Sequence, residues 1–133
     1  MAISIQFVNI TVSDVDESLA FYRDALGFEV RNDVGQGEFR WLTLGLPGSD
    51  AGAIVLSPPF AGRSKGEGDA LQELLVKGSL PMVVYATDDL DATFARAVAA
   101  GAEVVQEPIA QDWGQRDCAF RDPSGNMVRM AQA

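Results

Sequence analysis

Arg129 lies between Val128 and Met130, in the middle of an expected strand. A guanidinium in such an apolar stretch favours one of two roles. It could grip an anionic or carbonyl group of a ligand with its fork of donors. It could instead form an internal salt bridge, for which Asp117 is the acidic candidate, or extend to the rim of the fold. The sequence leaves both roles open.

Two tryptophans could present flat apolar surfaces to a ligand. Trp113 stands beside Gly114 and before the strand expected at 116–121. Its indole could form a flat surface on which a planar ligand stacks, or it could pack against the protein and anchor its loop. Trp41 holds the corresponding place in the first half of the chain, as a second plate or as part of the core.

The residue types exclude much catalytic chemistry. The chain has no histidine and one cysteine, Cys118. Histidine-dependent triads and pairs, cysteine-based zinc clusters and an intramolecular disulfide are therefore excluded. The acidic clusters at 14–16 and 88–91 stand at expected helix starts, where capping and the helix dipole account for them. A metal would have to be held by carboxylate and carbonyl oxygens alone, and a general acid or base would have to be Asp, Glu, Lys, Tyr or Cys118. We see no catalytic dyad among these residues.

Composition restricts the partners. The 133 residues suffice for roughly one domain, and 47% of them are hydrophobic. A net charge of −9 repels phosphate backbones and so disfavours nucleic-acid binding. No apolar run approaches the ~18 residues of a membrane helix, and the first residues lack the pattern of a signal peptide. We expect a cytoplasmic protein with neither a nucleic-acid nor a membrane partner.

An internal repeat organises the elements that must position these residues. Similar segments recur at an offset of 75 residues, which becomes 74 after a one-residue deletion. The paired segments are Val12–Asp16 with Thr87–Asp91, Gly27–Val30 with Gly101–Val104, and Ala53–Leu56 with Met127–Met130. A repeat that extends over several elements predicts two similar structural units.

Each half predicts the element order β-α-β-β-β. The expected strands are 3–12, 29–32, 40–44 and 53–56 in the first half, and 82–87, 103–106, 116–121 and 126–130 in the second. The expected helices carry apolar stripes at Val15, Leu19, Tyr22 and Leu26, and at Leu90, Phe94 and Val98. We predict one α+β domain over 1–133, with module 1 at about 1–57, a linker with a short helix near 70–76 at 58–80, and module 2 at 81–133.

The tandem β-α-β-β-β pattern resembles the vicinal oxygen chelate superfamily, which includes glyoxalases, bleomycin resistance proteins and extradiol dioxygenases. The motifs that carry the resemblance are 12–22 with Leu26-Gly27-Phe28, Ala99–Ala102, Trp113–Arg116 and Arg121–Asn126. The resemblance implies a curled mixed sheet with an internal cup, and a homodimer in which each cup is completed across subunits. Alternation along the strands predicts that Asn9 faces the cup.

The resemblance also identifies four positions at which enzymes of the superfamily hold a metal. They correspond here to Phe7, Val55, Met82 and Arg129, and none offers an oxygen or imidazole ligand. The resemblance therefore implies a metal-free member with an apolar cup. We predict no metal site, no cofactor and no catalytic residue, and we favour a protein that is not an enzyme. Metal-free antibiotic-binding members carry a Trp-Gly-x-Arg stretch similar to Trp113–Arg116.

These features predict that the protein binds a small, partly aromatic molecule, as resistance proteins sequester a drug. The expected ligand-binding residues are Trp113, Arg129, Phe7, Met82, Val55, Asn9, Trp41 and Gln115. One alternative is a lyase, isomerase or dioxygenase-type enzyme of the same superfamily with a displaced or absent metal. A second is an interaction module whose cup has collapsed.

Overall fold

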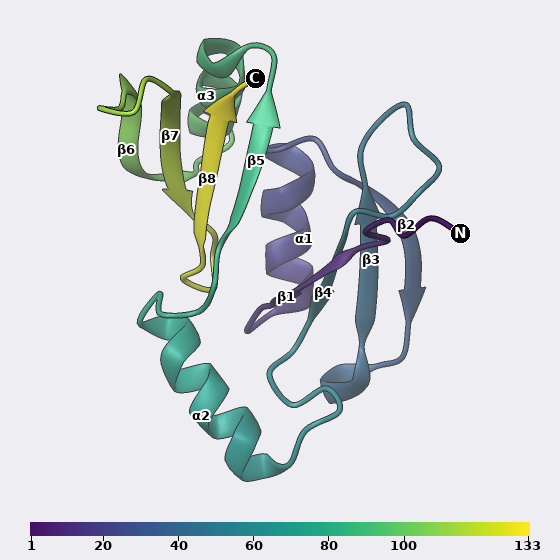
Figure 1. Cartoon of the computed structure of the whole chain (residues 1–133). Helices are drawn as coiled ribbons and strands as arrows, with labels where there is room; N and C mark the ends of the chain where they lie inside the picture. The colour runs from purple at the N-terminus through teal and green to yellow at the C-terminus, as the bar shows by residue number, and fades with distance from the viewer.

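A computed structural model describes residues 1–133 and contains two β-α-β-β-β modules joined by a helical linker (Figure 1). The first module comprises β1 (Val8–Thr11), α1 (Val15–Asp24), β2 (Glu29–Val34), the 3₁₀ turn η1 (Gly37–Phe39), β3 (Trp41–Gly45) and β4 (Ile54–Ser57). The linker carries α2 (Lys65–Val76). The second module comprises β5 (Val83–Thr87), α3 (Leu90–Ala99), β6 (Glu103–Ala110), β7 (Arg116–Arg121) and β8 (Met127–Gln132). The predicted α+β fold is confirmed.

Each module forms its own four-stranded mixed sheet. The strand orders are β1-β4-β3-β2 and β5-β8-β7-β6, and no hydrogen-bonded strand pair joins the two sheets. In both, the first strand pairs in parallel with the last, and the other pairs are antiparallel. β1 and β5 therefore each have one edge without a strand partner.

The repeat extends to the register of individual residues. Asn9 pairs with Val55 in the first sheet, and Val84 pairs with Arg129 in the second. Asn9 and Val84 are equivalent at the offset of 75, and Val55 and Arg129 at the offset of 74. Both sheets also have a β-bulge at the same place, between Val30 and Asn32 in β2 and between Val104 and Gln106 in β6. The sequence repeat is thus a structural repeat.

The helices begin and end as their sequences indicate. Asp14 and Asp89 cap α1 and α3 by accepting hydrogen bonds from the backbone N–H groups three residues on. Gly27 follows α1 in the left-handed region, at φ +83°. In α3 the predicted stripe is wrong at its end, because Ala97 is buried and Val98 is exposed. A period of 3.6 residues from Leu90 returns to the same face at position 97 rather than 98.

Two other predicted boundaries differ from the structure. The strand expected at 3–12 contains only Val8–Thr11, because β4 begins at Ile54, opposite Val8, and offers no partner to earlier residues. Ile3 and Ile5 are consequently almost fully exposed. The linker helix begins earlier than expected, at Lys65, because Ser64 and Glu67 form a capping box.

One hydrophobic core serves both modules. Most of its 16 residues come from α1, α3 and the helix-facing sides of both sheets, and Val12, Ala25 and Phe28 come from the adjoining connections. Figure 1 shows α1 between the strands of the two modules. The modules are also joined by polar contacts, among them Tyr22 Oη donating to Asp122 Oδ2 at 2.9 Å and Asn126 Nδ2 donating to the Thr11 carbonyl at 2.8 Å. No helix is long and apolar enough to cross a membrane.

Candidate functional site

Several of the candidate site residues lie on the sheet faces that point away from the shared core. Side chains alternate along a strand, so burial of Leu42, Leu44 and their neighbours against the helices turns the intervening residues outward. In the first sheet these outer residues include Asn9, Trp41 and Val55, and in the second they include Val84, Asp117 and Arg129. The two outer faces therefore lie on separate sheets with the core between them.

The four positions identified by the resemblance occupy equivalent places in the two sheets. Phe7 and Met82 directly precede β1 and β5, and both are partly exposed. Val55 and Arg129 lie in β4 and β8, where each faces the equivalent residue of the first strand. Val55 is buried although it lies on the outer face. Phe7 and Val55 belong to one sheet and Met82 and Arg129 to the other, so one chain holds two pairs rather than one cluster.

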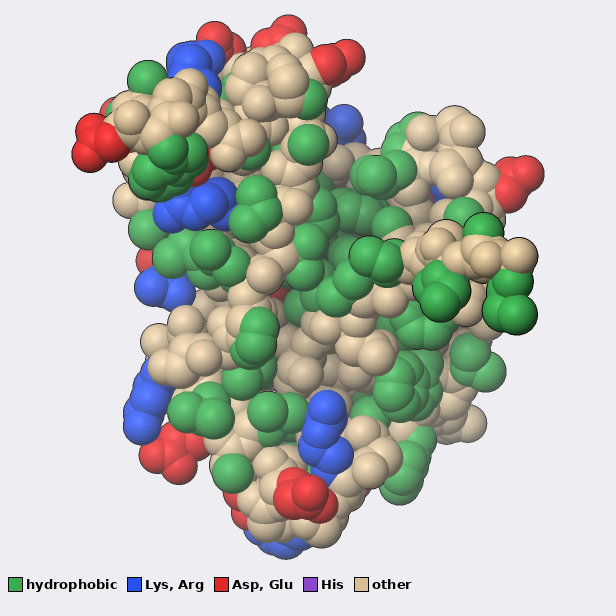
Figure 2. Space-filling view, viewed as in Figure 1, with side chains coloured by type: hydrophobic (Ala, Val, Ile, Leu, Met, Phe, Trp, Pro, Cys, Tyr) green, Lys and Arg blue, Asp and Glu red, His purple; other side chains and the backbone are tan.

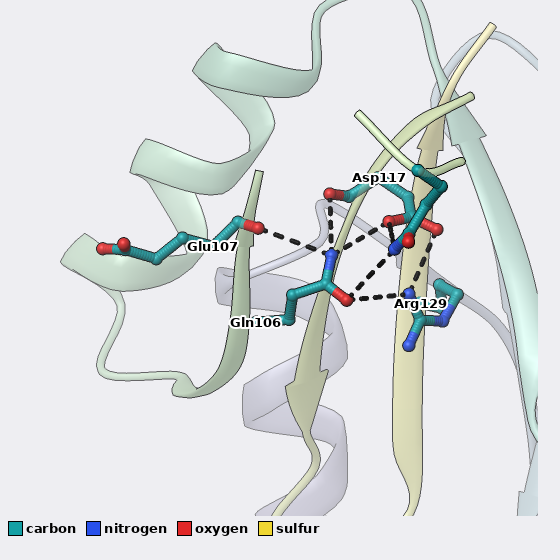
Figure 3. A network of polar contacts seen from close by, with 5 residues as sticks. Gln106, Glu107, Asp117 and Arg129 are labelled. Carbon is teal, nitrogen blue, oxygen red and sulfur yellow. Dashed lines mark hydrogen bonds and ion pairs between the residues drawn. The ribbon is translucent and has the colours of Figure 1, made fainter. Parts of the chain in front are cut away.

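Arg129 belongs to a polar network on the outer face of the second sheet (Figure 3). Its Nη1 donates to Asp117 Oδ2 at 3.1 Å and to Gln106 Oε1 at 3.4 Å. Gln106 Nε2 donates to Asp117 Oδ1 at 2.9 Å, and Gln111 Nε2 donates to the same oxygen at 2.8 Å. The side chain of Asp117 is 2% exposed and that of Arg129 is 24% exposed. Of the roles that the sequence leaves open for Arg129, the structure therefore contains the salt bridge with Asp117.

Two irregularities in β6 direct Gln106 into this network. The register between β6 and β7 shifts both before and after Gln106, which pairs with Ala119. A bulge re-aims the side chains around it, and here it brings Gln106 to the outer face next to Asp117. Figure 3 shows that the side chain of the next residue, Glu107, points away from the network.

The hydrogen bonds decide the charge of Asp117. Burial raises the pKa of its carboxyl, but the hydrogen bonds from Gln111, Gln106 and Arg129 outweigh this effect, and the net pKa lies below the usual value. Asp117 is therefore a charged acceptor at neutral pH. Its side chain is 2% exposed and its pKa is lowered, so it is a poor proton acceptor for a substrate.

Trp113 lies in the turn between β6 and β7, close in sequence to this network. The turn closes through the N–H of Gly114, which donates to the Gln111 carbonyl at 2.8 Å, and through the N–H of Gln111, which donates to the Gln115 carbonyl at 2.8 Å. The indole is 71% exposed, whereas Trp41 at the start of β3 is about half as exposed. Trp113 does not pack into the core, and its turn is tied to Asp117 through the Gln111 side chain.

A cavity of about 210 Å³ lies where the two modules meet. Its walls come mainly from the unpaired edges of β1 and β5, including Asn9 and Met82, and from Arg63, Leu71 and Leu80 of the linker. Figure 2 shows hydrophobic side chains gathered in the hollow between the two lobes of the molecule. Of the eight predicted site residues, this cavity brings together only Asn9 and Met82, and it does not include Arg129 or Trp113.

The remaining reactive groups offer no nucleophile or metal cluster. Burial raises the pKa of the Cys118 thiol to about 11, so the thiol is protonated at neutral pH. Three or more His, Cys, Asp or Glu side chains do not gather anywhere in the chain as a metal site would need.

Sequence reasoning missed Gln106 and Gln111 and named Asp117 only as a possible salt-bridge partner. The signal for Asp117 was available, because it lies on the same face of its strand as Ala119, the residue paired with Arg129. No simple signal identified Gln106, since its position depends on the bulges.

A family model described as Glyoxalase/Bleomycin resistance protein/Dioxygenase superfamily matches residues 4–130. Among curated proteins, the chain is similar to Uncharacterized protein YurT of Bacillus subtilis (strain 168). The two are 30% identical over 125 residues, which make up 93% of this chain and 94% of YurT.

Two solved structures are similar over nearly their whole length. UcmS2 has a TM-score of 0.85 and 34% identity, with 98% of each chain covered. TnmS3, an antibiotic binding protein from Streptomyces sp. CB03234, has a TM-score of 0.74 and 32% identity, with 99% of this chain and 98% of TnmS3 covered. The similarity therefore extends over both modules and the linker.

Proposed function

We propose that this chain, which belongs to the glyoxalase/bleomycin resistance protein/dioxygenase superfamily, reversibly binds a small, partly aromatic molecule without transforming it. The observation that carries the proposal is the full-length similarity to TnmS3, an antibiotic binding protein, at 32% identity. The outer face of the second sheet and its neighbouring segments supply what such binding needs. Trp113 offers an exposed indole, Met82 a flexible apolar side chain and Arg129 a guanidinium.

The metal that enzymes of the superfamily use does not fit the residues of this chain. Phe7 and Val55 have no lone pair to donate, and Arg129 is a cation that repels a metal ion. Met82 alone offers a thioether, a soft ligand that does not hold a hard divalent cation by itself. We therefore assign no step to a metal, and binding rather than metal-assisted chemistry is the function that these side chains support.

The proposed binding site lies between two copies of the chain. A ligand that touches both outer faces needs a second molecule, because the two faces of one chain point away from a shared core. We propose a homodimer in which the first sheet of one protomer and the second sheet of its partner enclose a cup. The exposed apolar side chains of Phe7, Trp41, Met82 and Val84 fit such a covered surface.

Calorimetric titration with a panel of aromatic antibiotics tests the proposal. We expect at least one compound to bind at about micromolar affinity, and Trp113→Ala and Arg129→Ala each to weaken it tenfold or more. Val76→Ala, a truncation of an exposed residue on α2, is the control and should leave affinity unchanged. Circular dichroism confirms that each variant is folded. Binding that neither Trp113→Ala nor Arg129→Ala weakens would place the site elsewhere, and a panel without any binder would contradict the proposed function.

A further inference from the structure

The polar network around Asp117 exists in only one of two otherwise repeated modules. By register, Arg129 corresponds to Val55, and Gln106 corresponds to Asn32. Asp117 corresponds to Trp41. Asp117 precedes Cys118, which pairs with Met130, and Trp41 precedes Leu42, which pairs with the equivalent residue Leu56. The same three places therefore hold a buried ionic network in the second sheet and mostly apolar side chains in the first.

The architecture of the sheet does not require this difference. A carboxylate that is 2% exposed has lost nearly all its hydration, and the network must offset that loss with its hydrogen bonds. The first sheet shows that the scaffold accepts a valine and a tryptophan at two of these places. Replacement of buried ionic groups by apolar ones of similar size is often neutral or stabilising. The network is therefore not needed to form the sheet, and it points to a task in addition to stability.

The network fixes Arg129 by one end of its guanidinium. All its hydrogen bonds come from Nη1, and Figure 3 shows its dashed lines ending on that nitrogen alone. Nε and Nη2 make no hydrogen bond within the chain, and they are not among the buried polar atoms that lack a partner. They therefore remain accessible donors on the outer face of β8.

We infer that Arg129 Nε and Nη2 form a subsite for an oxygen acceptor of the ligand, and that Gln106, Gln111 and Asp117 are positioning residues that hold this fork in place. The inference rests on the proposed function and deepens it. The ligand class is a planar aromatic molecule that carries a carbonyl, phenolate or carboxylate oxygen. A guanidinium fork recognises such oxygens with defined geometry, and its charge disfavours a cationic ligand.

The network also links this subsite to the aromatic plate. Gln111 donates to Asp117 through its side chain and closes the turn that carries Trp113 through its backbone. A ligand stacked on the indole would thus meet donors that are held by the same set of hydrogen bonds. Preorganised donors need no reordering when the ligand binds, which favours selectivity for acceptor-bearing molecules.

Three matched naphthalenes separate the inference from the proposed function. 2-Naphthoate carries a carboxylate, 2-naphthamide a carbonyl and 2-methylnaphthalene no acceptor. Calorimetry on the wild-type protein should show 2-naphthoate and 2-naphthamide binding at least tenfold tighter than 2-methylnaphthalene. Gln106→Leu, which removes a positioning residue and keeps Arg129, should reduce this preference to less than threefold while the affinity for 2-methylnaphthalene stays within twofold.

Further variants guard against a structural explanation. Arg129→Lys keeps the charge without the fork and should lose most of the preference for 2-naphthamide. Arg23→Gln, which removes an exposed arginine on α1, should change nothing. Asp117→Asn should also reduce the preference for 2-naphthoate and 2-naphthamide. If this variant does not fold, the results for Gln106→Leu and Arg129→Lys are sufficient to test the subsite. A preference that survives both variants, or 2-methylnaphthalene binding as tightly as the other two, overturns the subsite but leaves the proposed function intact. Failure of all three probes to bind overturns both.

Discussion

The charge of Asp117 shows how strongly a few hydrogen bonds control a buried residue. Burial alone would favour the neutral acid, yet three side-chain donors keep the carboxylate charged. The same donors come from a bulged strand, a turn and the last strand of the sheet. Loss of the charge would therefore loosen contacts between parts of the second module that are distant in sequence.

Protonation of Asp117 should destabilise the protein in acid. Its pKa is lower in the folded state than the unfolded value of about 3.9, so the charged form contributes stability above about pH 4. That contribution is lost as the pH falls through the folded-state pKa. We expect the free energy of unfolding, measured by urea titration from pH 7 to pH 3, to fall less steeply below pH 4 in Asp117→Asn than in wild type.

Asp91→Asn is the matched control for this titration. Asp91 forms an exposed ion pair with Arg116, which solvent screens, so its replacement should alter the acid dependence far less. Equal acid slopes in wild type and Asp117→Asn would show that the network does not titrate with folding.

Two tyrosines where the modules meet, buried Tyr22 and partly buried Tyr85, differ in one hydrogen bond. Tyr22 donates to Asp122, whereas the buried hydroxyl of Tyr85 has no partner. Tyr22→Phe should therefore destabilise the protein by about 1–2 kcal/mol, because it removes a bond to a buried carboxylate. Tyr85→Phe should be neutral or slightly stabilising. Urea unfolding monitored by tryptophan fluorescence measures both, and a larger loss for Tyr85→Phe would contradict the hydrogen-bond assignment.

At the scale of the elements, the sequence was sufficient to predict the order of strands and helices. The repeat carried most of this information, because a segment that is ambiguous in one half is supported by its counterpart in the other. Strand lengths were less predictable: the apolar alternation at 3–7 is strand-like, but no neighbouring strand reaches it. Pairing in a sheet depends on the partner, which a local pattern does not contain.

The same limit explains why the polar network was only partly predicted. Regular alternation would place Val104 and Gln106 on the same face of β6. The bulge instead pairs them with Phe120 and Ala119, adjacent residues that face opposite sides of β7. A one-residue irregularity therefore decided which side of the sheet Gln106 joins. The salt bridge between Arg129 and Asp117 could be predicted because β7 and β8 pair without an irregularity.

The glycines that follow α1 and α3 should respond differently to the same substitution. Both have positive φ, so an alanine at either position is strained by roughly 1–2 kcal/mol. At Gly27 an added Cβ would also lie 3.0 Å from Arg96 Nη1, whereas at Gly101 it meets nothing within 4 Å. Thermal unfolding should show Gly27→Ala to be the more destabilising.

Gly66 in the exposed part of α2 is the control for these two glycines. Its backbone is helical and an added Cβ meets nothing, so Gly66→Ala should stabilise by about 0.5–1 kcal/mol. A smaller loss at Gly27 than at Gly101 would show that Arg96 adapts without losing its hydrogen bond to the Asp24 carbonyl.

At the scale of the whole molecule, the exposed outer faces predict association of two chains. Val84 is exposed on β5, a strand with one unpaired edge, and Val98 is similarly exposed on α3. Under the proposed dimer, sedimentation equilibrium should give two chains per particle. Val84→Lys should weaken the dimer at least tenfold by placing a charge in the covered face, while Val98→Lys should not. Monomeric wild-type protein at micromolar concentration would contradict the proposed arrangement.

The bulge shared by both sheets has a consequence for how such a protein can change over generations. Two modules with the same register and the same irregularity have the imprint of one ancestral unit copied in tandem. Since each outer face lies on the far side of its sheet from the common core, mutations there leave the packing of the other copy undisturbed. The outer face of one module can therefore stay apolar while the outer face of the other gains charged residues. New ligand preferences can arise through changes in a single module.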